Sequence, residues 1–250
     1  MTVLTVGTSG WQYQDWRGGL YPAKLPQRLW LEHYAENFAT VEVNNAFYRL
    51  PEKSTFAQWR ERTPDDFVVA VKMSRYLTHV KRLHEPEEPV DRFLSRAEGL
   101  GRKLGPVLIQ LPPTLQGDPA ALDRTLARFP RDVEVVVEPR HPSWFTGKTR
   151  AVLERHRAAL CWADRKGRPL NPPWQTADFG YIRMHEGGAA PWPRYGRAAI
   201  AKCLDLAGQF PRTYVFFNND PGGAAVADAT ALAAMARRQG VEVSRSPAAR

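Results

Sequence analysis

The chain has 250 residues, of which 43% are hydrophobic and 24% are charged, an ordinary globular composition for one large domain or two small ones. No apolar run approaches the roughly 20 residues of a membrane-spanning helix, and the first residues lack the basic segment and apolar core of a signal peptide. We therefore expect a cytoplasmic protein that does not enter a membrane. The net charge of +9 favours an anionic partner, such as a phosphate ester or a nucleic acid, although a basic surface without a specific partner explains it equally well.

Apolar runs with the composition of buried strands recur along the chain, and most are followed by a helical pattern. The runs are residues 3–6, 40–45, 67–72, 107–111, 133–138, 160–164, 181–185 and 214–220, and the helical patterns cover 26–38, 54–59, 90–104, 118–129, 152–156, 200–210 and 226–240. Ser54 and the Asp118-Pro119 pair are typical of helix starts. The segment 165–178 contains three prolines, so we expect its helix to be short or missing. Cys161 and Cys203 lie far apart in apolar patterns and are expected to be buried thiols.

This alternation predicts an α/β fold, specifically a TIM-type (β/α)8 barrel of eight parallel strands with surrounding helices. We expect a single domain over residues 1–243 and a frayed C-terminal tail over 244–250. An open, doubly wound sheet is the alternative, but its common forms use fewer strands and carry a glycine fingerprint that Gly7 and Gly10 fit poorly.

Polar residues interrupt the apolar runs at or near their carboxyl ends. They are Glu42, Asn44, Lys72, Gln110, Glu138, Arg140, Asp164, Arg183, His185, Asn218 and Asn219. In a barrel all carboxyl ends meet on one face, where the active sites of such barrels lie. Scattered ion pairs of the core would have no reason to prefer these ends, so the pattern predicts a functional site.

The chemistry favoured by these residues is acid/base catalysis on a small anionic ligand, by a hydrolase or a lyase. Lys72, Arg140 and Arg183 would hold a phosphate or carboxylate, and Glu138, Glu42 or His185 would move a proton. Asn44, Gln110 and Asn218 would orient the ligand. Trp11, Tyr48, His141 and Trp144 are further candidates for ligand contacts, although Trp11 also fits a lid packed on its own aromatic residues.

Two other chemistries remain open. A divalent metal is possible at Glu138, Asp164 and His185, but few histidines lie at strand ends and the nearby cations would repel a metal ion, so no cofactor is predicted. Glu42 and Glu138 also fit the paired carboxylates of a glycoside hydrolase.

A protein of another class, which binds nucleic acid without catalysis, is also compatible with the sequence. The loop after the third strand carries Arg75, Tyr76, Lys81 and Arg82, and basic and aromatic side chains together suit a phosphate backbone with stacked bases. A solvated charged loop is the commoner explanation of such a run. The sequence does not indicate an oligomeric state.

Six motifs, in order, resemble the domain-of-unknown-function family 72, the YecE-like proteins. They are Gly7-Thr8-Ser9-Gly10-Trp11, Val41-Glu42-Val43-Asn44 with Phe47-Tyr48-Arg49-Leu50-Pro51, Gln110-Leu111-Pro112-Pro113, Val137-Glu138-Pro139-Arg140-His141-Pro142-Ser143-Trp144, Arg183-Met184-His185, and Phe217-Asn218-Asn219. The resemblance implies a TIM-type barrel but no established reaction. The family pattern usually continues His-Gly after the seventh strand, whereas Glu186 intervenes here, a departure that concerns the loop and not the strand.

The expected barrel is also similar in outline to barrels of the xylose-isomerase and apurinic-endonuclease type, which use several histidine and carboxylate metal ligands. This similarity adds a metal-dependent phosphoesterase to the alternative functions.

Overall fold

The structure is a computed structural model that describes residues 2–248. Its strands are β1 (Val3–Ser9), β2 (Thr40–Val43), β3 (Val68–Lys72), β4 (Leu104–Gln110), β5 (Val135–Glu138), β6 (Ala159–Leu160), β7 (Trp162–Arg165), β8 (Arg168–Pro169), β9 (Gly180–Glu186), β10 (Arg212–Phe217) and β11 (Glu242–Val243). Its α-helices are α1 (Trp30–Asn37), α2 (Asn45–Tyr48), α3 (Lys53–Glu61), α4 (Glu87–Ala97), α5 (Pro119–Leu126), α6 (Gly147–His156), α7 (Arg197–Ala207) and α8 (Ala224–Arg238). Short 3-10 helices cover Gln14–Trp16, Gln27–Leu29, Glu98–Lys103, Pro142–Trp144 and Pro221–Gly223, and a π-helix covers Tyr76–Val80.

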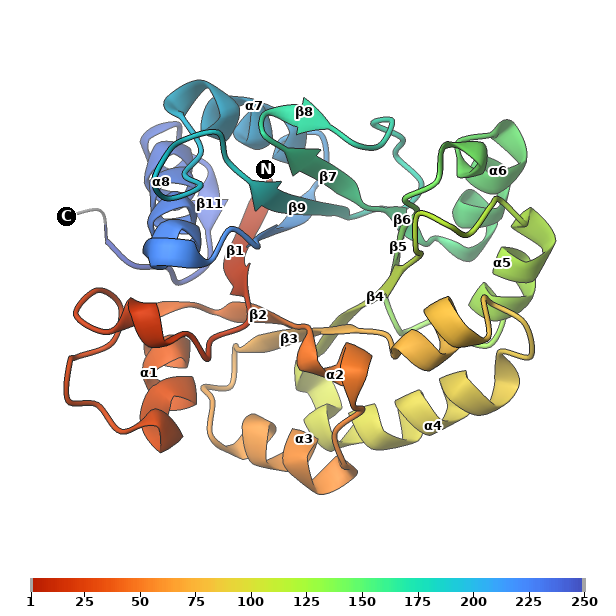
Figure 1. The fold of residues 1–250 in the computed structure, drawn as a ribbon, viewed down its shortest axis with the longest axis horizontal. Helices are drawn as coiled ribbons and strands as arrows, with labels where there is room; N and C mark the ends of the chain where they lie inside the picture. The colour runs from red at the N-terminus through yellow and green to blue at the C-terminus, as the bar shows by residue number, and fades with distance from the viewer. Residues whose placement is uncertain (1, 249–250) are drawn as a thin grey trace.

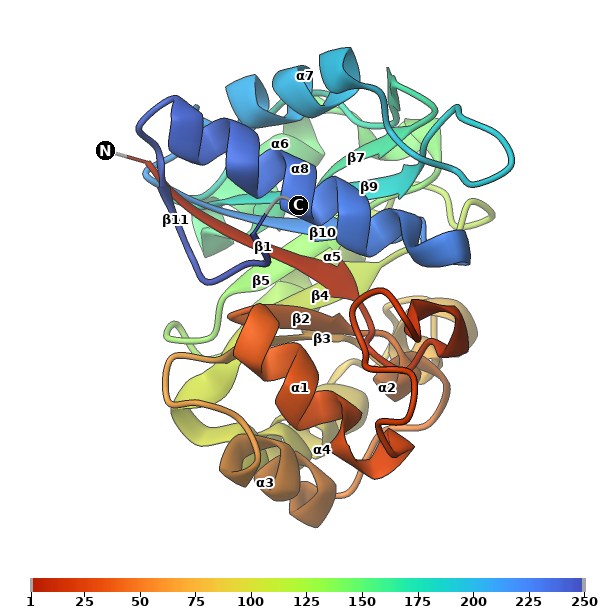
Figure 2. The same cartoon turned by 90° about the vertical axis from the view of Figure 1, so that its left-hand side faces the viewer.

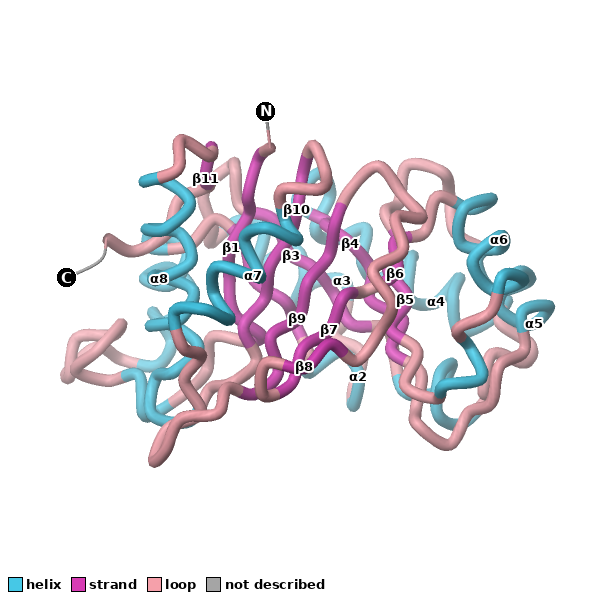
Figure 3. Tube along the Cα trace, turned by 90° about the horizontal axis from the view of Figure 1, so that it is seen from above, coloured by secondary structure: helices cyan, strands magenta, loops and turns pink. Residues whose placement is uncertain are grey.

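The strands form one curled, mostly parallel sheet with helices on its outside (Figure 1). The order is β6-β5-β4-β3-β2-β1-β10-β9-β7-β8, and β11 pairs with β1. The hairpin between β7 and β8 is antiparallel. Figure 2 shows α1 and α3 on one side of the strands and α7 and α8 on the other, while Figure 3 shows the strands between α8 and the pair α5 and α6. The predicted α/β fold with a parallel sheet and surrounding helices is confirmed at this level.

The sixth predicted strand is divided in two. Cys161 separates β6, which pairs with β5, from β7, which pairs with β9. Two short strands, β8 and β11, were not predicted, because neither has an apolar run: β8 is the exposed pair Arg168–Pro169 and β11 the pair Glu242–Val243.

The two faces of the sheet belong to different apolar clusters, as expected when successive side chains of a strand point to opposite sides. The larger cluster joins strand residues such as Val69, Val107 and Val137 to the helices. The smaller cluster contains no helical residue and consists of Ala70, Leu108, Val136, Ala159, Cys161, Ala163, Phe179, Tyr181, Tyr214 and Phe216. These side chains therefore fill the inside of the curled sheet.

Most local predictions agree with the structure, and one helix start does not. The Asp118 carboxylate accepts a hydrogen bond from the Ala121 backbone N–H and caps α5, as predicted. The segment 165–178 forms no α-helix, also as predicted. Helix α3, however, begins at Lys53 after Glu52, so Ser54 is not its cap, because Pro51 and Glu52 already lead the chain into the helix.

The tail beyond Val243 was expected to fray, but its first residues are attached to the body of the protein. The Ser244 backbone N–H donates to the Leu4 carbonyl at 2.9 Å. Arg245 donates to both carboxylate oxygens of Asp66, at 2.8 and 3.0 Å. Charged and polar side chains thus hold a segment that has no apolar pattern, which is why periodicity did not reveal it. The end of the predicted tail, 249–250, lies outside the described residues.

Among the described residues, no helix is both long and apolar enough to cross a membrane.

Candidate functional site

The inner face of the sheet changes from apolar to polar at the carboxyl ends of the strands. Lys72, Gln110, Glu138, Arg183 and Asn218 each follow an inner-face residue of their own strand by two positions. Because the side-chain period of a strand is two, all five continue the inner face. The parallel strands bring them to one end of the sheet, and we call this end the mouth.

A buried ion cluster lies at the base of the mouth, centred on Arg183, whose side chain is 2% exposed. Its Nη2 donates to Oε1 of Glu42 at 2.7 Å, and its Nη1 donates to Oε2 of Glu138 at 2.6 Å. Ser9 Oγ and the Tyr181 hydroxyl also donate to the Glu42 carboxylate, each at 2.6 Å. Every charge in this cluster therefore has a close partner, as buried charges require.

The two buried glutamates remain ionised. Burial by itself would raise the pKa of Glu42 and of Glu138, but the Arg183 charge and the donated hydrogen bonds outweigh it and lower both. The same two carboxylates hold the pKa of Arg183 above its ordinary value despite burial. Glu42 has no contact with the cavity described below, whereas Glu138 does.

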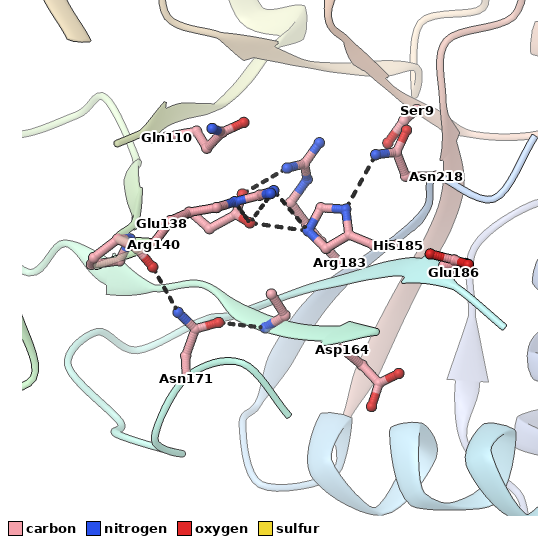
Figure 4. Close-up of polar contacts among 12 residues, drawn as sticks. Ser9, Gln110, Glu138, Arg140, Asp164, Asn171, Arg183, His185, Glu186 and Asn218 are labelled. Carbon is pink, nitrogen blue, oxygen red and sulfur yellow. Dashed lines mark hydrogen bonds and ion pairs between the residues drawn. The ribbon is translucent and has the colours of Figure 1, made fainter. Parts of the chain in front are cut away.

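Glu138 connects this cluster to three further side chains (Figure 4). Its Oε1 accepts from Arg140 Nη2 at 2.8 Å and Nε at 3.1 Å, and lies 3.0 Å from His185 Nε2. On the other side of the imidazole ring, Nδ1 lies 3.2 Å from Asn218 Nδ2. The predicted residues of β5, β9 and β10 thus form one connected group.

The contacts of His185 with Asn218 and Glu138 favour one form of the ring, while the opposing contact of Arg140 Nη2 with Nε2, at 3.2 Å, is longer than the 3.0 Å contact of Nε2 with Glu138. An amide nitrogen at Nδ1 can only donate, so Nδ1 accepts, and in the neutral ring Nε2 then carries the hydrogen and donates to Glu138. Burial lowers the pKa of His185, and the charges of Arg183 and Arg140 act in the same direction against the opposing effect of Glu138. His185 is therefore neutral at pH 7, with its basic nitrogen on the side of Asn218.

A cavity of about 540 Å³ opens beside this group. Its lining comprises Pro113, Glu138, Pro139, Arg140, Arg165, Leu170, Asn171, His185 and Asn218. The Arg140 side chain is 31% exposed although it contacts a buried carboxylate, and the other cation of the lining, Arg165, is 63% exposed and pairs with Glu186. The cavity therefore combines an accessible positive charge with a neutral, oriented imidazole.

Lys72 and Gln110 form a second polar pair at the mouth. Lys72 Nζ donates to Gln110 Oε1 at 2.7 Å and lies 4.1 Å from the centre of the Phe47 ring. Burial lowers the pKa of Lys72 to about 8, and the neighbouring charge of Arg183 adds to this effect. Neither residue lines the cavity, so they are placed at its side and not within it.

The remaining predicted ligand contacts are dispersed. Asn44 lies over the cluster, with Nδ2 3.4 Å from Glu42 and a buried Oδ1 that has no hydrogen-bond partner. Trp144 is fully buried and donates to the Leu115 carbonyl, and the buried Trp11 packs edge-on against another indole, that of Trp59. Two further candidates do not line the cavity: Tyr48, which is 76% exposed, and His141, whose side chain caps the turn Pro142–Trp144.

The three possible metal ligands do not converge. Asp164 Oδ1 accepts from the Gly167 backbone N–H in the turn between β7 and β8, whereas Glu138 and His185 contact each other. Within residues 2–248, no three His, Cys, Asp or Glu side chains gather in a way that suits a metal ion.

Two residues that were not among the candidates belong to the surroundings of the mouth. Asn171 lines the cavity and joins two strand ends, with Nδ2 donating to the Pro139 carbonyl and Oδ1 accepting from the Ala163 N–H. Asp220 follows β10, and its buried Oδ1 has no hydrogen-bond partner. Burial raises the pKa of Asp220 to about 7. Asp220 follows Asn218 and Asn219 at the end of an apolar run. This position after a strand is the sequence signal that could have identified Asp220 as a candidate.

The unusual Glu186 extends strand β9 by one residue. Its carboxylate pairs with Arg165 at 2.8 Å and with Lys166 at 3.1 Å. The following Gly187 donates to the Pro193 carbonyl, and a Cβ atom there would lie 2.1 Å from the Arg194 carbonyl oxygen. Glu186 therefore attaches the β7–β8 hairpin to β9, while glycine remains necessary directly after it.

Comparisons with known proteins agree with the six motifs. A profile of the family described as "Protein of unknown function DUF72" matches residues 5–250. The UPF0759 protein YunF of Bacillus subtilis is 29% identical over 152 residues, which are 58% of this chain and 53% of that protein, so the match spans about half of the relative.

Solved structures show the same fold. A DUF72 family protein of Thermotoga maritima has a TM-score of 0.81 and 28% identity, over 94% of this chain and 99% of that one. A DUF72 family protein of Enterococcus faecalis has a TM-score of 0.74 and 21% identity, over 97% and 99%, and supports the fold alone. Because the family profile covers nearly all residues, the chain belongs to the DUF72 family.

Proposed function

We propose that the protein binds a small phosphate- or carboxylate-bearing ligand in the cavity at the mouth and transfers a proton to or from it. The observation that carries this proposal is the contact of Glu138 with both Arg140 and His185 at the wall of the cavity. It supplies an accessible cation for the anion and an oriented base for the proton within one group of side chains.

The charges at the mouth favour an anionic ligand. Arg183 balances only one of the two glutamates that it contacts, and Arg140 balances the other. Lys72 then adds a positive charge whenever it is protonated, so the site accepts an anion without leaving a buried charge uncompensated. Arg140 has unused N–H donors because its other contacts involve only Nε and Nη2, and a guanidinium binds phosphate or carboxylate oxygens well.

His185 is the proposed proton-transfer group, and Glu138 positions it. The Glu138 carboxylate fixes the ring so that Nδ1 keeps its lone pair. An acidic hydrogen of the ligand would replace the amide of Asn218 at Nδ1, and the protonated ring would then be stabilised by the Glu138 charge. Glu42 supports this arrangement through Arg183 and does not itself contact the ligand.

We further infer that β6 and β7 act as one strand, which would close the sheet into an eight-stranded TIM-type barrel. The pairing of β6 with β5 and of β7 with β9 supports this, because the two short strands are one residue apart. The backbone N–H of that residue, Cys161, donates to the Val137 carbonyl of β5. The mouth would then correspond to the face on which such barrels carry their active sites.

Sulfate is a suitable first probe, because it is a tetrahedral anion whose charge is constant across the neutral range. Its binding is measured by titration calorimetry with the unmodified protein, with Arg140→Gln, and with the control Arg150→Gln. Arg150 pairs with Glu154 on the exposed face of α6 and does not line the cavity. We expect Arg140→Gln to weaken binding by at least tenfold, since a charge-assisted hydrogen bond contributes about 1.5–3 kcal/mol, and Arg150→Gln to leave it unchanged. Equal affinity in all three proteins would refute the proposed anion site.

Nucleic-acid binding without catalysis is the second candidate, and the exposed Tyr48 on the rim favours it. The loop after β3 supports it less than its composition suggested, because Lys81 pairs with Glu85 and Arg82 donates to the Thr114 carbonyl. A single-stranded oligonucleotide whose affinity falls steeply with salt, and falls again in Tyr48→Ala, would favour this candidate over a small anion.

A further inference from the structure

A second cavity, of about 170 Å³, lies outside the sheet, between strands β7 and β9 and helix α7. Its apolar wall is formed by Trp162, Ile182, Met184, Ala199, Cys203 and Leu206. Trp162, Ile182 and Met184 belong to the cluster on the helix side of the sheet, so this space is separated from the inner face that carries the mouth.

The missing helix between β7 and β9 accounts for this cavity. Other strands of the sheet are followed by an α-helix that covers their outer face, but residues 166–179 form only the hairpin strand β8 and irregular chain. Pro169 and Pro173 of this segment line the cavity. A thin layer of irregular chain thus takes the place of a helix, and an apolar hollow remains between this layer, the strands and α7.

Of the three charged or amide side chains around the hollow, two have hydrogen-bond partners and the third is exposed. Asp164 Oδ1 accepts from the Gly167 N–H, and both polar groups of Asn171 are hydrogen-bonded to the backbone. The third polar lining residue, Lys202, is exposed at the edge. A buried water needs two to four polar partners, whereas apolar cavities of about 150 Å³ stay dry and accept benzene or xenon. The lining is therefore suited to an apolar occupant.

We propose that this hollow is a binding site for a small apolar molecule, or for an apolar group of about six carbon atoms. The site is independent of the proposed anion site, although one residue, Asn171, lines both cavities. Gly167 and Pro169 line the apolar cavity, while Arg165 and Leu170 line the cavity at the mouth. The β7–β8 hairpin therefore forms the wall between the two cavities. An occupant would make this hairpin more rigid.

Benzene tests the proposal through the thermal unfolding of the full chain, since a ligand that binds only the folded state raises the unfolding temperature. Ala199→Leu places a larger side chain in the cavity, and Ala198→Leu places the same side chain on the exposed side of α7. We expect benzene to raise the unfolding temperature of the unmodified protein and of Ala198→Leu, and to have little effect on Ala199→Leu. Each protein is compared with its own benzene-free value, so a stability change caused by the substitution itself is removed.

Two independent measurements locate the ligand. A crystal under xenon pressure should show xenon against Trp162, and benzene should slow amide exchange in residues 164–171. A rise in unfolding temperature of equal size in Ala199→Leu, or no rise in the unmodified protein near benzene saturation, would overturn the proposal.

Discussion

His185 Nε2 lies 3.0 Å from Glu138 Oε1, and this contact distinguishes the two buried glutamates of the mouth. Glu42 and Glu138 share Arg183, but only Glu138 orients the imidazole. We expect Glu138→Gln and Glu42→Gln each to destabilise the fold by on the order of 3–5 kcal/mol, because each breaks a buried ion pair. Chemical denaturation measures this loss.

Only Glu138→Gln should change the titration of His185. Since the Glu138 charge raises the pKa of His185 against burial, its removal should lower that pKa further. NMR of the labelled imidazole follows the titration in the folded fraction of each variant. A similar change in Glu42→Gln would show that the effect spreads through the whole cluster and does not depend on the direct contact.

Lys72 should make anion binding depend on pH in the alkaline range. Its pKa is lowered to about 8, so its charge, and the attraction it exerts, is lost as the pH rises through about 8. Sulfate affinity should therefore fall between pH 7 and pH 9. In Lys72→Arg the side chain stays charged, and the fall should be much smaller. Calorimetry measures the sulfate affinity of both proteins at the two pH values. An equal fall in affinity in the two proteins would exclude Lys72 as the titrating group.

Asp220 should make stability depend on pH in the acidic to neutral range. Its folded-state pKa of about 7 lies above the ordinary value of 3.8, so the folded protein binds the proton more tightly than the unfolded chain does. The stabilisation is present below about 3.8 and is lost as the pH rises to about 7. Burial is the main cause, and the carboxylates of Asp15 and Glu42 and the hydroxyl of Tyr13 also act on it.

Asp220→Asn removes this dependence. Relative to the unmodified protein, the variant should become more stable on going from pH 5 to pH 8, as measured by thermal unfolding at several pH values. Asp205→Asn, at an exposed position of α7, is the control and should follow the unmodified protein. If Asp220→Asn also follows it, Asp220 is not the group that titrates.

Truncation of Trp144 should reduce the stability of the fold strongly, whereas truncation of Tyr48 should hardly change it. Trp144 is fully buried and hydrogen-bonded, so Trp144→Ala should destabilise the protein by about 3–5 kcal/mol. Tyr48 is largely exposed, so Tyr48→Ala should change stability little. Chemical denaturation of both variants measures their contribution to stability, and sulfate titration measures any contact with a ligand. A third variant, Trp144→Phe, keeps an aromatic ring in the core. If it folds well but binds sulfate more weakly, Trp144 contacts the ligand directly.

The positions of the strands and the polar character of their ends could be predicted, because each depends on a local pattern. Apolar runs identified every long strand, and the polar residues noted at their carboxyl ends, Lys72 and Arg183 among them, lie on the inner face of the sheet. The partners at the mouth could not be predicted in the same way. The enclosure of Arg183 by two glutamates depends on distances across the sheet that no single segment contains.

Residues in irregular chain were the least predictable. The sequence around Asn171 indicates only a proline-rich loop, and its place in the wall of the mouth depends on how that loop folds back over β7. Trp11 and Trp144 are aromatic residues beside strand ends, where burial and ligand contact have the same sequence signal. The attachment of the tail depends on Arg245 and Asp66, two charges with no periodic context.

The pairing of β1 with β2, β10 and β11 also determines when the fold can be completed during synthesis. A ribosome releases β1 and β2 early, but the partners of β1 over residues 212–243 emerge only after most of the chain has been made. Until then β1 has an edge with unsatisfied backbone groups, which is a site for pairing with other chains. The sheet therefore cannot be completed before residue 243 has been made, and we expect chaperones to be needed most during the synthesis that precedes this point.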